Sequence, residues 1–128
     1  MRKPAALFLV LAAATGLPQP LAAQDASLAK VQDGAAALQK GNAGQAVSAY
    51  TDALNNPTLG NDRRASILND RAVAYIRLGQ TRAAFDDFNR AVQLFPEYAA
   101  TYNNRGNLLL ALNLPKEAAK DFDRAIVL

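Results

Sequence analysis

Apolar residues recur at helical spacing in the middle of the chain. Leu68, Ala72 and Tyr75 follow one another at intervals of four and three, which places them on one face of a helix. Gly79 then permits the left-handed backbone conformation that often ends a helix. After this turn a second helical pattern runs as far as Pro96, which cannot continue it. The pattern predicts two helices joined by a tight turn.

This pair of helical patterns recurs along the chain. Residues 65–98 are followed directly by a second copy in residues 99–128. The matched positions include Arg71 with Arg105, Ala72 with Gly106, Asp87 with Asp121, Phe88 with Phe122, and Ala91 with Ala125. Another copy lies upstream at a slightly larger offset, where Gly34, Ala46, Tyr50 and Ala53 precede Ala72, Ala84, Phe88 and Ala91. The additional residues fall in the stretch NNPTLGNDRR, which we expect to be a loop that tolerates insertion.

Small and aromatic side chains keep the same places in all three copies. Alanine or glycine occurs where two helices would approach closely, and Tyr50, Phe88 and Phe122 fill the space beside them. One aromatic stripe alone would be ordinary core. Small and large residues repeated in one phase are a more specific signal, and the length and pattern of the unit resemble the tetratricopeptide repeat (TPR) family.

The TPR resemblance covers nearly all of residues 27–128 and implies a fold. It implies an all-α, right-handed α-solenoid of three antiparallel helix-turn-helix hairpins, with repeats at 27–57, 65–98 and 99–128 in a domain of residues 24–128. The chain departs from the family pattern because it has no tryptophan and because Pro57 comes one place early. TPR proteins generally act as scaffolds, so the resemblance implies a protein or extended peptide as the partner.

The first residues have the features of an export signal. Arg2 and Lys3 precede the apolar run PAALFLVLAAATG, which is too short to cross a bilayer of about 30 Å as a helix. Prolines follow, and residues 21–23 are compact side chains of the kind that a signal peptidase reads. We interpret residues 1–23 as a secretory signal peptide and expect a periplasmic or secreted protein. A retained membrane anchor is the alternative, although no cysteine follows the run to carry a lipid.

Composition and charge argue against several classes of function. The formal charge of +3 includes Arg2 and Lys3, so the remainder has 12 cations and 11 acids and lacks the basic excess typical of nucleic-acid binding. The sequence has no histidine and no cysteine, which removes the commonest general base, metal ligand and thiol nucleophile. Asp86 and Asp87 are adjacent, so on a helix they diverge by about 100° and cannot flank one bond. We expect neither an enzyme nor a cofactor, and no membrane contact after signal cleavage.

Two arginines are each followed by an aspartate at the same spacing. Arg71 precedes Asp87 and Arg105 precedes Asp121, an offset that can bring the side chains together across a helical hairpin. The first copy has neither member of the pair, since Asp33 and an alanine take these places. We interpret the two pairs as structural ion pairs, with solvated charges or a ligand contact as the alternatives.

The first helix of each repeat would line the concave face of a TPR solenoid. On this chain that face would carry Asn69, Asp70, Arg77, Asn103, Asn104 and Asn107. Amides donate and accept hydrogen bonds at once, so they can pair with the backbone of an extended peptide. The hypothesis is a peptide-binding groove, and the alternative is a hydrated polar face without a specific ligand. One TPR variant clamps a terminal carboxylate with cationic side chains, which Val31, Asp70 and Ala100 largely replace here.

The last repeat ends without a polar capping helix. Phe122, Ile126 and Val127 are expected to leave an apolar face, because repeat arrays normally need a capping element. Three explanations remain open: the chain is part of a longer array, it self-associates through this C-terminal hairpin, or its last helix frays.

Overall fold

The computed structural model describes residues 21–128, with side chains from Ala26 onward. This part of the chain forms six α-helices and contains no β-strand. In chain order they are α2 (Leu21–Gln39), α3 (Ala43–Leu54), α4 (Asn61–Arg77), α5 (Thr81–Leu94), α6 (Ala99–Ala111) and α7 (Pro115–Val127). The predicted signal peptide, residues 1–23, lies outside the described residues except for its last three, whose backbone belongs to α2. The predicted all-α class is confirmed.

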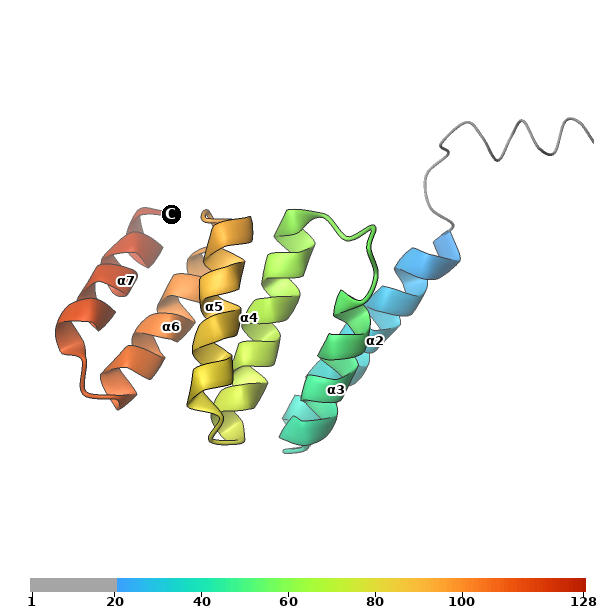
Figure 1. Cartoon of the computed structure of the whole chain (residues 1–128), viewed down its shortest axis with the longest axis horizontal. Helices are drawn as coiled ribbons and strands as arrows, with labels where there is room; N and C mark the ends of the chain where they lie inside the picture. The colour runs from blue at the N-terminus through green and yellow to red at the C-terminus, as the bar shows by residue number, and fades with distance from the viewer. Residues whose placement is uncertain (1–20) are drawn as a thin grey trace, which may run out of the picture.

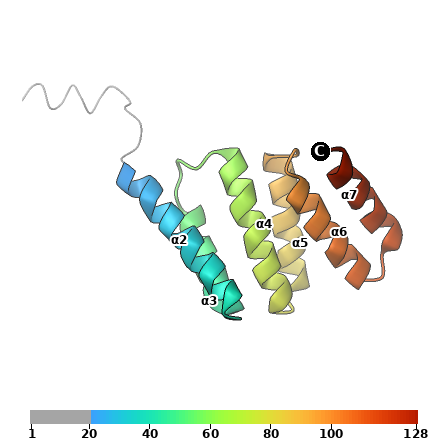
Figure 2. The ribbon, with the colours of Figure 1, turned by 180° about the vertical axis from the view of Figure 1, so that it is seen from behind.

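The helices form three antiparallel hairpins that stack side by side. Figure 1 shows α3 in front of α2 and α5 in front of α4, and Figure 2 shows the reverse order from behind, with α6 and α7 side by side in both views. Each hairpin contributes one helix to the layer of first helices, α2, α4 and α6, and one to the layer of second helices, α3, α5 and α7, and its two helices are neighbours along the chain. This is the predicted solenoid of three hairpins.

Each hairpin turns at a residue with positive φ. Gly41 has φ 80° and Gly79 has φ 74°, as expected for residues without a Cβ atom. The third turn uses Asn113 at φ 62°, and asparagine is among the non-glycine residues that most readily adopt this conformation. In the second turn the amides of Gly79 and Gln80 both donate at 2.9 Å, to the carbonyls of Ile76 and Tyr75, which satisfies the end of α4.

The aromatic residue of each hairpin packs against a small residue of its first helix. Tyr50 and Phe88 are almost completely buried. A Cβ atom on Gly34 would lie 2.6 Å from the Tyr50 ring, and one on Gly106 would lie 2.7 Å from the Phe122 ring. Because Gly34 and Gly106 have no side chain, the two helices of the first hairpin, and likewise those of the third, can pack this closely.

The stretch NNPTLGNDRR is only partly a loop. Residues 55–60 connect α3 to α4, but residues 61–64 are helical and form an additional first turn of α4 that α6 does not have. The expectation of a loop throughout this stretch was therefore wrong for NDRR. The chain places Asp62 in this turn, where an acidic side chain suits the positive end of the helix dipole.

Candidate functional site

The helices α2, α4 and α6 share one solvent-facing side. On α4 this side carries Arg63, Ser66, Asp70, Val73 and Arg77, which recur at intervals of three or four and are exposed or half-buried. The equivalent residues of α6 are Ala100, Asn104, Asn107 and Ala111, and those of α2 are Leu28, Gln32, Ala35 and Gln39. We call the surface formed by these residues the open face. It contains four of the six residues that the sequence assigned to a groove.

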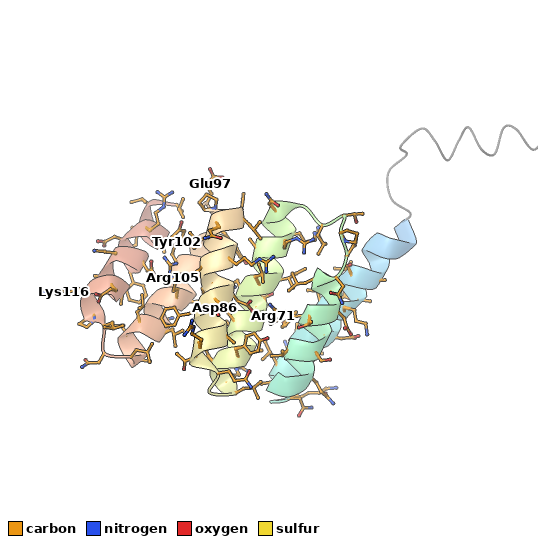
Figure 3. All side chains as sticks on the ribbon, in the orientation of Figure 1. Arg71, Asp86, Glu97, Tyr102, Arg105 and Lys116 are labelled. Carbon is orange, nitrogen blue, oxygen red and sulfur yellow. The ribbon has the colours of Figure 1, made fainter. Side chains whose placement is uncertain are left out.

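The two predicted ion pairs lie inside the solenoid, away from the open face. Arg71 donates from Nε and Nη2 to both carboxylate oxygens of Asp87, at 2.7 and 2.8 Å. Arg105 makes the same two-pronged contact with Asp121, at the same two distances. Figure 3 shows both labelled arginines within the helical stack. Hydrogen bonding to Asp87, more than any other contact, raises the pKa of Arg71, so the guanidinium is held charged.

Each arginine also has a third contact that the sequence pattern did not indicate. Nη1 of Arg71 donates to Thr51 Oγ1 at 3.0 Å, which ties α4 to α3 of the preceding hairpin. Nη1 of Arg105 donates to Asn89 Oδ1 at 2.9 Å, which ties α6 to α5. The ion pairs therefore hold neighbouring hairpins together in addition to the two helices of one hairpin.

Asn69 is buried at the junction of the second and third hairpins. Only 3% of its surface is exposed, and its Oδ1 accepts a hydrogen bond from Asn104 Nδ2 at 3.0 Å. Its own Nδ2 donates to Asp70 Oδ1 at 3.2 Å. Asn69 thus links and orients two residues of the open face, Asp70 and Asn104, and lies beneath that face.

Asn103 and Asn107 are both exposed, but they face different surroundings. Asn107 lies on the open face. Asn103 instead lines a shallow hollow of about 470 Å³ at the free end of the solenoid, beside Phe122 and Ile126. Asn103 occupies the place in the third hairpin that Asn69 occupies in the second. It is exposed because none of the three described hairpins covers it.

Asp70 and Arg77 are two of the three charged residues of the open face, and Arg63 is the third. Arg77 reaches across to α2 and donates to the carbonyl of Leu38 at 2.8 Å. Asp70 is half-buried, and no cation of the described residues lies within salt-bridge distance of it. Burial raises the pKa of the Asp70 carboxyl, and the hydrogen bond from Asn69 opposes part of that rise. Folding therefore disfavours the charged form of the Asp70 carboxyl on the open face. Charged groups that are disfavoured in this way are common at ligand-binding sites.

The raised pKa of Asp70 predicts a dependence of stability on pH. Above that pKa the folded state holds a disfavoured charge, whereas below the ordinary value of 3.8 both folded and unfolded carboxyls are neutral. We expect Asp70→Asn to raise the free energy of unfolding at neutral pH, because asparagine is neutral and can still accept from Asn69. This gain in the free energy of unfolding should shrink as the pH falls toward 3.8, the ordinary pKa of an aspartate carboxyl. Urea unfolding across this pH range measures it, with Asp86→Asn as the exposed control. A variant less stable at neutral pH would contradict the prediction.

Two kinds of feature are not found among the described residues. Among residues 21–128 no helix is both long and apolar enough to span a membrane. In the same range no three acidic side chains come close enough together to bind a metal ion.

Comparison with known proteins supports the repeat assignment. Two family models, both described as Tetratricopeptide repeat, match residues 65–98 and residues 99–128. The chain is 36% identical over 63 residues to human mitochondrial import receptor subunit TOM70, a match covering 49% of this chain and 10% of that protein. It is 33% identical over 95 residues to human RNA polymerase II-associated protein 3, covering 71% of this chain and 13% of that protein. The chain thus corresponds to about a tenth of either relative.

The solved structures agree with this assignment. The first TPR of Spaghetti (RPAP3), bound to the HSP90 peptide SRMEEVD, superposes with a TM-score of 0.72 at 28% identity, over 80% of each chain. This similarity extends over most of the residues that form the three hairpins.

Proposed function

The chain belongs to the tetratricopeptide repeat family, and from this premise we propose that its open face binds an extended segment of a protein partner. The observation that carries the proposal is the half-buried Asp70, which is retained without a cationic partner among the described residues. A carboxylate in such a place accepts backbone N–H groups strongly. Asn104 and Asn107, one helix further along, can donate to backbone carbonyls.

The polar residues of the open face suit recognition of a peptide backbone. Asn69 fixes the Asp70 and Asn104 side chains from below, so both are positioned before a ligand arrives. Pre-positioned groups lose less conformational entropy on binding. Asp70 repels a carboxylate placed directly beside it, and Val31 and Ala100 supply no cation for clamping a terminal carboxylate.

A peptide library tests the proposal directly. We expect the purified chain to select members of a library of N-acetylated, C-amidated heptapeptides of random sequence. The double variant Asp70→Asn, Asn107→Ala should bind the selected peptides about tenfold more weakly. It replaces a charge-assisted hydrogen bond by a neutral one of about half the strength, and it removes a second hydrogen bond worth about 1 kcal/mol. The matched control is Arg82→Ala, Asp86→Ala, an exposed pair on α5 in the opposite layer. No selection by the wild type, or equal losses in both double variants, would contradict the proposal.

A second candidate role is self-association through the C-terminal hairpin, as a structural module. Ile126 is 80% exposed and Val127 is 72% exposed, and Ile126 borders the hollow that Phe122 lines. The counterpart of Phe122 in the second hairpin, Phe88, is instead fully buried against Leu108 of the next hairpin. Light scattering at tens of micromolar measures the mass in solution, and a monomer would contradict this role.

We also propose that the protein is exported. The basic residues and short apolar run within residues 1–23 favour cleavage and release to a periplasmic or secreted location. Mass spectrometry of the N-terminus of the protein recovered from cells tests this. An intact Met1 on the exported protein would contradict cleavage.

A further inference from the structure

A hollow of about 360 Å³ lies between α2 and α4, beneath the loop of residues 55–60. Leu28 and Val31 of α2 form one wall, and Ile67 of α4 with Leu59 of the loop forms the other. Arg63 lies at its edge, in the additional first turn of α4. Its volume is near the lower end of ligand pockets, which span about 300 to 1,000 Å³. The hollow therefore suits one side chain with its neighbouring backbone, and we call it the loop pocket.

Hydrogen bonds from both sides hold the loop over this pocket. Asn56 Nδ2 donates to Ser27 Oγ of α2 at 2.9 Å. Its Oδ1 accepts from the backbone and side chain of Thr58, at 3.0 and 2.7 Å, which closes a tight turn. From α4, Arg64 donates to the carbonyls of Leu54 and Asn56, at 2.9 and 2.8 Å. Because α2 and α4 both anchor the loop, the pocket is formed before any ligand binds.

The lining of the pocket is mixed. Leu28, Val31, Leu59 and Ile67 are apolar, whereas Ser27, Asn56, Thr58 and the one cation, Arg63, are polar. Leu28 is 45% exposed, so it leaves apolar surface open to solvent at the pocket. Arg63 is exposed, and no carboxylate of the described residues lies within salt-bridge distance of it. Two turns further along the same side of α4 lies Asp70. The charge of the open face therefore alternates along α4, with Arg63 beside the loop pocket, Asp70 beyond it and Arg77 near the end of the helix.

We propose that the loop pocket is the specificity site of the open face, and that it takes a leucine, methionine or phenylalanine side chain flanked by a carboxylate that pairs with Arg63. The inference rests on the proposed function, because it assigns the bound segment a sequence preference. Apolar walls select a large apolar side chain. The exposed guanidinium selects an acidic neighbour, since it pairs with carboxylates in a two-pronged geometry. Asp70 disfavours a second acid further along the segment.

Two variants separate the apolar and the charged part of the preference. Leu28→Trp places an indole at the pocket, and because Leu28 is already exposed the substitution leaves the core intact. Arg63→Glu reverses the charge at the edge of the pocket. Arg82→Glu is the matched control, because it reverses an exposed arginine on α5 in the other layer. Circular dichroism verifies the helical content of all three.

The test is a positional-scanning library of the same N-acetylated, C-amidated heptapeptides. The wild type is expected to select a large apolar residue beside aspartate or glutamate. Leu28→Trp should weaken the best peptide about tenfold or more, the effect of expelling one apolar side chain. Arg63→Glu should replace the acidic preference by lysine or arginine, and Arg82→Glu should change neither preference.

The outcomes distinguish this inference from the function on which it rests. If the wild type selects peptides without an apolar or acidic preference, or if Arg63→Glu keeps the acidic preference, the loop pocket is not the specificity site while peptide binding stands. If the wild type selects no peptide, both the inference and the proposed function are overturned.

Discussion

Replacing Asp87 by alanine should lower the free energy of unfolding by about 3 to 5 kcal/mol, because it leaves the Arg71 guanidinium, whose side chain is only 17% exposed, without its partner. The Asp87 side chain is 7% exposed and accepts two hydrogen bonds from Arg71. Domains are stable by about 5 to 15 kcal/mol in total, so this loss would remove a large fraction of the stability. Urea denaturation followed by circular dichroism measures the loss.

The neighbouring aspartate is the control for this prediction. Asp86 is adjacent on the same helix, but its side chain is 68% exposed and lies 3.9 Å from an exposed Arg82. Exposed pairs contribute little, so Asp86→Ala should change the stability by an amount near the error of the measurement. Combining Asp87→Ala with Arg71→Ala should cost clearly less than the sum of the two single losses. Additive losses would show that the two residues do not stabilise the fold as a pair.

Truncating Phe88 should have an effect of similar size for a different reason. Its ring is completely buried, at 0% exposure, and it packs with Ala72, Ala84 and Leu108 between the second and third hairpins. Phe88→Ala is expected to lower the free energy of unfolding by about 3 to 5 kcal/mol, through lost burial and an unfilled cavity. The measurement is again urea denaturation, with the midpoint compared at a fixed slope.

The third hairpin offers a matched comparison for Phe88. Phe122 has the same place in its repeat but is only partly buried, because none of the described helices covers it as α6 covers Phe88. Phe122→Ala should therefore cost clearly less than Phe88→Ala. Equal losses in the two variants would indicate that stacking of the next hairpin contributes nothing to the energy of this core position.

The sequence predicted much of the candidate site, but it did not predict that Asn69 and Asn103 differ in burial. The repeated arginine-to-aspartate spacing predicted a contact between Arg71 and Asp87, and the structure contains it. Assigning Asn69 and Asn103 to one groove did not anticipate that Asn69 is buried while Asn103 is exposed at the end of the solenoid. Both have the same local pattern, so no local rule could separate them.

The sequence by itself determined the helices, their pairing into hairpins and the small-to-large packing within each hairpin. These features depend on periodicity and on contacts between residues close in the chain, which the repeated pattern encodes. The tertiary structure alone decided which residues of the pattern are covered by a neighbouring hairpin and which remain open. It also decided that Leu28 and Arg63, which lie far apart in the sequence, border one pocket. Such contacts depend on how one hairpin stacks on the next and on how a loop is anchored, and neither follows from the pattern of a single repeat.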